Sequence, residues 1–322
     1  MPGLAAGDSA IDRKRSSAPA GKVSLLLAAL LVLSELGGCG HAQLQPAGPV
    51  SAAEREILYD SLVIMLAIVV PTILAVLGVV FWFRPSNRRA RRMPDFVYSG
   101  RVELVVWSIP ALVVIFLGGI AWIGSHDLDP AKPLPSAHAP LDVQVVSLDW
   151  KWLFIYPKQG IASVNRLVIP AGVPLHLTLT SATVWNVFWV PQLGTMIYCM
   201  SGMADNLYLE ASHRGVYYGE SAMIDGDGFP DMHFNTHAVS PHRFEAWVQA
   251  TRGSGAVLDE QSYRQLLRQS VPPHPYTYRS VQPGLFADIV TLRLSPGNGP
   301  RAGAPGVHPV SATPAPPATS SP

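Results

Sequence analysis

Two long apolar stretches constrain this chain more than any other feature. They run from about Ile57 to Phe83 and from about Leu104 to Ile123, and a helix needs roughly 20 apolar residues to cross a bilayer. Trp82 and Trp107 lie within them, and such side chains suit the membrane interface. The chain is 14% charged, whereas soluble domains are about one-quarter charged. The sequence therefore predicts a membrane α-hairpin of two transmembrane helices and argues against a wholly cytosolic enzyme.

The segment between these stretches is rich in arginine. From Arg84 to Arg101 it carries one acid, Asp95, against six basic residues: Arg84, Arg88, Arg89, Arg91, Arg92 and Arg101. Short arginine-rich loops stay in the cytoplasm, so everything after residue 123 is expected to face outward. A patch for nucleic acid or lipid headgroups is the alternative interpretation. Because the net charge is only +1 and no other basic block exists, no nucleic acid partner is expected.

The N-terminus has the pattern of a bacterial lipoprotein signal. Basic residues precede the apolar run Val23–Leu33, whose 11 residues are too few to span a bilayer. Leu36-Gly37-Gly38-Cys39 then resembles a lipobox, which predicts cleavage after residue 38 and an acyl chain such as palmitate on Cys39. A cleavage site of small residues that happens to contain cysteine is the alternative. Residues 1–38 are thus predicted as a signal peptide and residues 39–125 as a lipidated N-terminus with the hairpin.

The remainder of the chain changes its period twice. Residues 126–240 show short strands with period-two alternation and turn residues between them, which favours a Greek-key β-sandwich. The strands are expected at Leu141–Leu148, Asn165–Ile169, Leu175–Leu179, Trp185–Val190, Asn206–Glu210 and Met232–Val239. Residues 241–294 have a helical period, with helices expected at Arg243–Gln249, Leu258–Gln269 and Gly284–Leu294. Residues 295–322 carry eight prolines and are expected to be a disordered tail.

Several ordered motifs resemble a known family. The aromatic stretch Asp149–Pro157, the sequence Phe188–Gly194 and the sequence Gly215–Gly219 are similar to segments of subunit II of the heme-copper terminal oxidases. The resemblance spans roughly Glu54 to Ile289. It implies a cupredoxin-like Greek-key sandwich outside the membrane, with short C-terminal helices.

The same resemblance points to the branch of the family. Members that take electrons from cytochrome c hold a binuclear copper centre in a loop that reads C-x-E-x-C-x3-H-x2-M. This chain keeps only the methionine of that ligand set, with Ser221 and Asp225 at the thiolate positions, Met223 at the glutamate, Phe229 and Asn186 at the histidines, and Met232 retained. The resemblance therefore implies no metal on this chain.

The residue types lead to the same expectation without the family. Two bridged copper ions need soft thiolate ligands, and the chain has two cysteines, Cys39 at the lipobox and Cys199. We expect Cys199 to be a buried apolar residue rather than a redox site. His233 and His237 stand about 13 Å apart if they lie on one strand, at roughly 3.3 Å per residue. One metal ion cannot bind both.

The chain is identified as resembling the quinol-oxidising branch, the cytochrome bo-type ubiquinol oxidases. Phe244–Val248 and Val281–Ile289 are similar to the C-terminal region of this branch. The resemblance implies a noncatalytic subunit of a quinol:O2 oxidoreductase in the bacterial inner membrane, with its C-terminal domain in the periplasm. The hemes, one copper and the ubiquinol pocket are expected on subunit I, beside other small membrane subunits and membrane lipid. A cytochrome c oxidase subunit and a freestanding envelope lipoprotein are the alternatives.

Three further groups of residues could carry chemistry. Glu103 opens the second apolar stretch, and the resemblance implies a place near the cytoplasmic mouth of a proton-uptake path. Pairing with arginines of the loop is the alternative. Trp150 and Trp152 are expected to serve packing. Three aspartates lack the spacing of a calcium-binding loop and are expected in a solvated turn: Asp225, Asp227 and Asp231.

Overall fold

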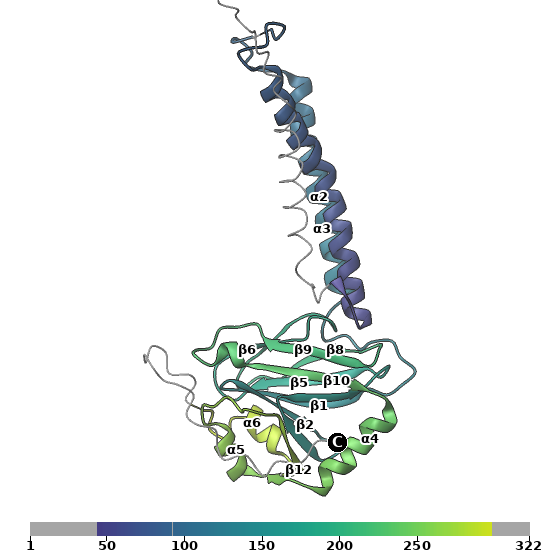
Figure 1. The fold of residues 1–322 in the computed structure, drawn as a ribbon, viewed down its shortest axis with the longest axis vertical. Helices are drawn as coiled ribbons and strands as arrows, with labels where there is room; N and C mark the ends of the chain where they lie inside the picture. The colour runs from purple at the N-terminus through teal and green to yellow at the C-terminus, as the bar shows by residue number, and fades with distance from the viewer. Residues whose placement is uncertain (1–43, 92, 298–322) are drawn as a thin grey trace, which may run out of the picture. The chain divides into compact units, whose positions relative to one another are not determined.

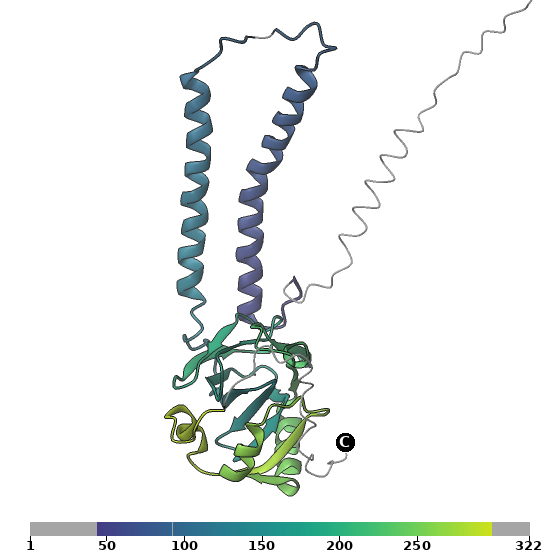
Figure 2. The same ribbon diagram turned by 90° about the vertical axis from the view of Figure 1, so that its left-hand side faces the viewer.

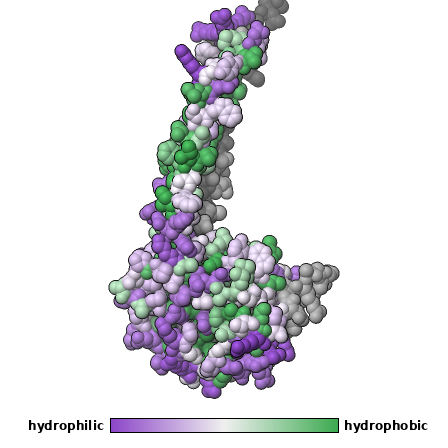
Figure 3. All heavy atoms as spheres, turned by 180° about the vertical axis from the view of Figure 1, so that it is seen from behind, coloured by the Kyte–Doolittle hydropathy of each residue, from purple (hydrophilic) through white to green (hydrophobic). Residues whose placement is uncertain are grey.

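The computed structural model describes residues 44–91 and 93–297. Two long helices come first, α2 (Pro49–Trp82) and α3 (Gly100–Asp127) (Figures 1 and 2). Residues 83–99 join them and are called the arginine loop below. The most apolar windows of the two helices have mean hydropathies of 2.9 and 2.4, and neither window is buried inside the protein. Apolar side chains are correspondingly exposed along the helices in Figure 3. Both helices are candidate membrane spans, as the sequence predicts.

Both helices are longer than the apolar stretches that reveal them. Helix α2 begins at Pro49 rather than Ile57. Proline suits the first helical position, and the Ser51 side chain makes hydrogen bonds with backbone groups at the start of the helix. The Ser51 hydroxyl accepts a hydrogen bond from Gly48 N at 3.3 Å and lies 2.7 Å from the Gln192 carbonyl, to which it can donate. Hydropathy marks only the part of a helix that faces lipid, so polar first and last turns escape it.

The rest of the described chain contains two β-sheets packed face to face (Figure 1). One sheet has the order β11-β12-β3-β2-β1-β5-β8 and the other has the order β4-β10-β9-β6-β7. The strands are β1 (Leu141–Leu148), β2 (Lys151–Tyr156), β3 (Ile161–Val164), β4 (Arg166–Pro170), β5 (Leu175–Ser181), β6 (Asn186–Trp189), β7 (Ile197–Cys199), β8 (Asp205–Leu209), β9 (Gly215–Ser221), β10 (His233–Val239), β11 (Ala256–Leu258) and β12 (Tyr276–Val281). The predicted sandwich is confirmed.

Strand β2 is buried on both faces, which explains its continuous apolar sequence. Trp152 and Phe154 point between the two sheets, where their rings contact Phe188 and Phe234 edge to face or at a tilt. The alternate residues, such as Leu153, point to a second apolar cluster on the other side of the sheet. Alternation along one strand thus supplies side chains to two cores.

The C-terminal region closes the second cluster and is not helical throughout. It contains helices α4 (Pro241–Gly253), α5 (Glu260–Leu266) and α6 (Leu285–Val290), but also β11 and β12, which extend the larger sheet. Strand β12 pairs antiparallel with β3. Its six residues are mostly half-buried, so they lack the clear alternation that would have predicted a strand.

Several predicted segments lie outside the described residues. These are the signal peptide of residues 1–38, Cys39, Arg92 and most of the predicted tail. Residues 295–297 are described, and Gly297 N donates to the Ala182 carbonyl at 2.8 Å.

Candidate functional site

The smaller sheet brings together four residues that the family resemblance placed at copper-ligand positions. Asn186 begins β6 and Ser221 ends β9, and these strands are hydrogen-bonded neighbours. Met232 directly precedes β10, and its carbonyl accepts a hydrogen bond from Ser221 N at 3.2 Å. Asp225 lies in the loop between β9 and β10. All four side chains are buried, with exposed fractions of 1–8%, so sheet topology and one loop create a single interior site, called the Asn186 cluster below.

Asn186 is the hub of this cluster. Its Nδ2 donates to Asp225 Oδ2 at 2.8 Å and lies 3.4 Å from the Met232 sulfur. Its Oδ1 accepts from the hydroxyl of Ser221 and from Val187 N. These contacts join β6 to the loop that follows β9, across 39 residues of sequence. A hydrogen-bonded network therefore joins the positions that the family resemblance assigns to copper ligands.

Asp225 is the titratable member of the cluster. Burial raises the pKa of its carboxyl to about 6, and the nearby charge of Asp149 acts in the same direction, while the hydrogen bond from Asn186 opposes both. Burial likewise raises the pKa of Asp149. Among the described residues, neither Asp149 Oδ1 nor Asp225 Oδ1 has a hydrogen-bond partner. The expectation that Asp225 lies in a solvated turn is wrong, although Asp227 and Asp231 are exposed.

The residues present do not fit a binuclear copper centre. The cluster offers one thioether, one amide, one hydroxyl and one carboxylate, and the amide already binds the other three groups. Thiolate bridges are missing, and a neutral or hard donor set of this kind does not hold two copper ions. Phe229 lies in a short 3-10 helix (Phe229–Asp231) and has no ligating atom. Within the described part of the chain, no group of three His, Cys, Asp or Glu could hold a metal ion.

Lys151 forms a second buried polar site that sequence reasoning missed. It is 1% exposed, and its Nζ lies 2.7 Å from the Arg268 carbonyl, 2.9 Å from Ser270 Oγ and 3.2 Å from each of the Ser270 and Asp149 carbonyls. Burial lowers the pKa of this amine to about 8, partly offset by the charge of Asp149. The available signal was a lysine between two tryptophans in an otherwise apolar strand. Lys151 fixes the segment after α5 onto the sandwich.

The two tryptophans pack as predicted. Trp152 is fully buried, and Trp150 is 2% exposed and has a positive φ of 63°. The Trp150 indole Nε1 lies 3.4 Å from the Asp225 carbonyl, at the outer limit of a hydrogen bond. Trp150 therefore lies between Asp149 and the loop that holds Asp225.

The comparisons with known proteins agree with this geometry. Residues 144–239 match the family model described as cytochrome c oxidase subunit II, periplasmic domain. Ubiquinol oxidase subunit 2 of Acetobacter aceti is 45% identical over 79% of this chain and 83% of its own length. Cytochrome bo(3) ubiquinol oxidase subunit 2 is 41% identical in Pseudomonas aeruginosa, over 80% of this chain and 77% of that protein. The protein of that name in Pseudomonas putida is 39% identical, over 79% of this chain and 81% of that protein.

This chain belongs to the ubiquinol oxidase subunit 2 family. The predicted family and the predicted cupredoxin-like sandwich are confirmed. The Asn186 cluster lies within the residues that match the family model.

Other candidate residues of the subunit do not join the cluster. Cys199 is fully buried, and burial raises the pKa of its thiol, as expected of an apolar core residue. The His233 ring is exposed and stacks on Tyr218 at 5.7 Å. His237 is half-buried, and its pKa is lowered by burial and by Arg166. The two histidines lie on β10 without forming a metal site with other described residues.

Glu103 lies in the first turn of α3 with its side chain exposed. Among the described residues it makes no ion pair, since the four pairs are Lys158–Asp142, His176–Asp142, Arg264–Glu260 and Arg293–Asp288. Pairing of Glu103 with arginines of the loop is therefore not observed. Its proton-uptake role stays a prediction, as does lipidation of Cys39.

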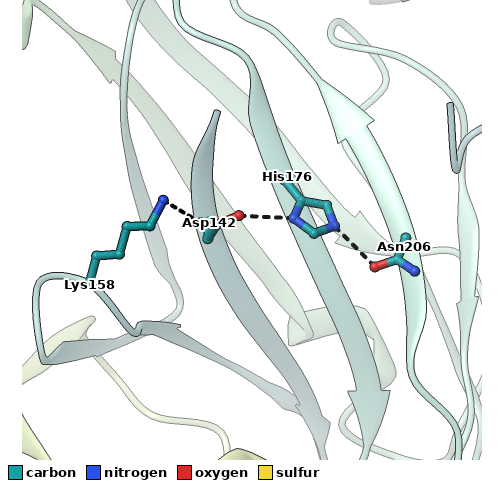
Figure 4. A network of polar contacts seen from close by, with 4 residues as sticks. All are labelled: Asp142, Lys158, His176 and Asn206. Carbon is teal, nitrogen blue, oxygen red and sulfur yellow. Dashed lines mark hydrogen bonds and ion pairs between the residues drawn. The ribbon is translucent and has the colours of Figure 1, made fainter. Parts of the chain in front are cut away.

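A polar network lies on the open face of the larger sheet (Figure 4). Asp142 on β1 contacts Lys158 at 2.7 Å and His176 Nδ1 at 2.9 Å, and His176 Nε2 lies 3.0 Å from Asn206 Oδ1. Partial burial of Asp142 opposes ionisation, but the hydrogen bonds from Lys158 and His176 outweigh it and lower the pKa of its carboxyl. The His176 ring stacks on Tyr208 at 4.5 Å. These contacts connect β1, β5 and β8 on the part of this face that the C-terminal helices leave uncovered.

Proposed function

We propose that this chain is subunit II of a proton-translocating ubiquinol oxidase, which oxidises quinol and reduces O2 to water. The curated relatives that support this proposal are named as ubiquinol oxidase subunits 2. The chain contributes structure and assembly to the complex rather than a redox group of its own.

The observation that carries the proposal is the Asn186 cluster. A subunit that receives electrons from cytochrome c needs a metal relay in this domain, and the ligand positions here are occupied by side chains bonded to one another. A quinol dissolves in the bilayer and can reach subunit I directly, so no relay is required through the sandwich and its C-terminal helices (Leu141–Val290), called the outer domain below. The cytochrome c oxidase alternative is disfavoured by the same contacts.

The partners follow from this assignment. Helices α2 and α3 are 34 and 28 residues long with apolar side chains exposed, and we propose that they pack on subunit I in the bacterial inner membrane. The hemes, one copper and the quinol pocket belong to subunit I, and other small membrane subunits complete the complex. The sandwich faces the periplasm, and an acyl chain on Cys39 provides a further anchor.

Glu103 has a proposed role at the opposite surface. Its exposed carboxyl lies at the end of α3 that adjoins the arginine loop. A carboxylate at the membrane edge can collect protons from the aqueous phase. We propose that it lies near the entrance of a proton-uptake path in subunit I.

The test is the purified native complex, tagged on this chain and solubilised gently. We expect heme in the preparation, oxygen consumption with reduced ubiquinol but not with reduced cytochrome c, and no near-infrared band of a binuclear copper. Appreciable turnover of cytochrome c would overturn the proposal. A preparation without heme would favour a freestanding envelope lipoprotein. Mass spectrometry of the mature chain, beside the Cys39→Ala variant, tests lipidation separately.

A further inference from the structure

The arginine loop concentrates positive charge without internal compensation. Four of its arginines and Arg101 in the first turn of α3 are described, and all five have exposed side chains: Arg84, Arg88, Arg89, Arg91 and Arg101. Asp95 is the loop's one acid. None of these arginines takes part in the ion pairs of the described residues, which all lie in the outer domain. Five guanidinium groups are therefore free to bind anions.

The same loop also exposes large apolar side chains. Exposed fractions are 62% for Met93, 58% for Phe96, 90% for Val97 and 69% for Tyr98. A soluble loop that exposes four such neighbouring side chains to water gains nothing from them. Basic and aromatic side chains together are typical of segments that rest in the headgroup layer of a membrane.

The contacts at the end of α2 keep the first half of the loop close to that helix. Asn87 Nδ2 donates to the Trp82 carbonyl at 2.6 Å, and Asn87 N donates to the Arg84 carbonyl at 3.0 Å. Asn87 Oδ1 then accepts from Arg89 N at 3.1 Å. These bonds turn the chain immediately after the apolar helix, so the following arginines remain near the bilayer surface instead of extending into solution.

We propose that the arginine loop binds the phosphate groups of anionic phospholipids, with Arg88, Arg89 and Arg91 as the principal contacts. Guanidinium groups match phosphate oxygens in bidentate geometry, and the exposed apolar residues contact the adjoining acyl boundary. This inference rests on the proposed membrane placement of α2 and α3, since both ends of the loop continue into those helices. The charge of the arginines then accounts for the preference for anionic headgroups, and the exposed apolar residues keep the loop at the membrane surface.

The size of the effect follows from the charge that is removed. Each basic side chain near an anionic lipid surface strengthens association by roughly fivefold. Removal of three arginines should therefore abolish most of the headgroup preference, even if the spans keep the chain in the membrane.

The test uses the intact complex, purified in neutral detergent and incubated with equimolar phosphatidylglycerol and phosphatidylcholine before repurification. The headgroup ratio of the retained lipid is measured for wild type and for the triple variant Arg88→Gln, Arg89→Gln, Arg91→Gln. The matched control is Arg214→Gln, Arg243→Gln, Arg279→Gln, which removes the same charge from exposed positions of the outer domain. Inorganic phosphate is added in a separate arm, because soluble phosphate offers the same chemistry as a headgroup.

We expect wild type and control to enrich phosphatidylglycerol and the loop variant to lose that enrichment by at least roughly fivefold. High salt should weaken the enrichment and inorganic phosphate should not displace the lipid. Equal headgroup ratios in wild type and loop variant, or displacement by free phosphate, would overturn the proposal. Heme content and quinol turnover of the same preparations report on the proposed function independently. A loop variant that no longer assembles is replaced by Arg→Lys at the three positions, which should retain most of the enrichment.

Discussion

Gly228 lies against the indole ring of Trp150 so closely that a β-carbon on Gly228 would overlap ring atoms. Trp150 is buried with a positive φ, so the ring has little room to withdraw. We expect Gly228→Ala to destabilise the outer domain by about 1–3 kcal/mol through overpacking. Tryptophan fluorescence during urea unfolding of the detergent-solubilised chain measures this change. Gly253→Ala is the control, because a β-carbon there would meet no neighbouring side chain or segment within 4 Å, and an equal loss at that position would contradict the explanation.

Removal of the amide hub should uncouple the Asn186 cluster. Asn186→Ala leaves the buried Asp225 carboxylate without its amide donor, whereas Ser221 keeps its contacts with the Met223 backbone; an unsatisfied buried group costs about 1–3 kcal/mol. The Ser221→Ala variant should cost less, and the double variant should cost less than the sum of both single changes. The exposed Asn235→Ala on β10 serves as control. Strict additivity of the two cluster variants would show that no network exists.

Asp225 should make stability depend on pH below neutrality. The folded-state pKa of about 6 exceeds the ordinary value of 3.8, so the unfolded chain releases this proton first as pH rises. Stability contributed by the neutral carboxyl is therefore present below about pH 4 and is lost as pH rises through about 6. Asp225→Asn stays neutral and should remove this loss, so its advantage over wild type should grow from pH 4 to pH 7.

The measurement is the difference in unfolding free energy between variant and wild type at several pH values. Two pKa units correspond to about 3 kcal/mol, which is an upper bound for the gain at pH 7. Asp227→Asn changes an exposed carboxyl of the same loop and should leave the pH profile unaltered. A variant advantage that does not change with pH would refute the titration of Asp225.

Lys151 should be required to hold the segment after α5. Lys151→Met keeps the length of the side chain but leaves the carbonyls of Arg268 and Ser270 without their donor. A buried acceptor left without its donor costs about 1–3 kcal/mol. We expect lower stability and faster proteolysis between α5 and β12, measured on the intact complex. Lys158→Met, at an exposed surface pair, should cost at most about 1 kcal/mol.

Glu103→Gln tests the proposed proton entrance. The change removes the charge while keeping the side-chain volume, so assembly should be unaffected and quinol turnover should fall severalfold. Glu103→Asp should recover part of the rate, and the exposed Glu245→Gln in the outer domain should have no effect. In reconstituted complexes of each variant, oxygen consumption measures quinol turnover and proton uptake measures proton delivery. Full turnover in Glu103→Gln would leave the glutamate without a role in proton delivery.

The sequence predicted the elements whose periodicity is strong. The two apolar helices lie where their apolar stretches predicted them, although both are longer, and strands such as β1, β5 and β10 appear close to their predicted bounds, because their alternation or apolar length is sustained. The sequence did not predict the short strands β7 and β11, which have three residues each. Strand β12 was not predicted, because it lies in a segment whose period appeared helical. Its extended conformation depends on tertiary pairing with β3.

The site was predictable in its composition but not in its contacts. Family motifs placed Asn186, Ser221 and Asp225 at the lost ligand positions, and all three do meet. That the amide would bond the other two depends on how the loop after β9 folds. The burial of Asp225 was missed for the same reason, because neighbouring Asp227 and Asp231 are exposed and local composition resembles a surface turn.

The late position of β12 along the chain has a consequence for folding. Strand β3 cannot receive its neighbour until β12 has been synthesised, and the second apolar cluster cannot close over Leu153 until Phe286 and Ile289 have followed. A chain that ends in front of β12 would leave an unpaired sheet edge and an exposed set of apolar side chains, which favour aggregation. The subunit therefore completes its core only when nearly all of its described residues have been synthesised.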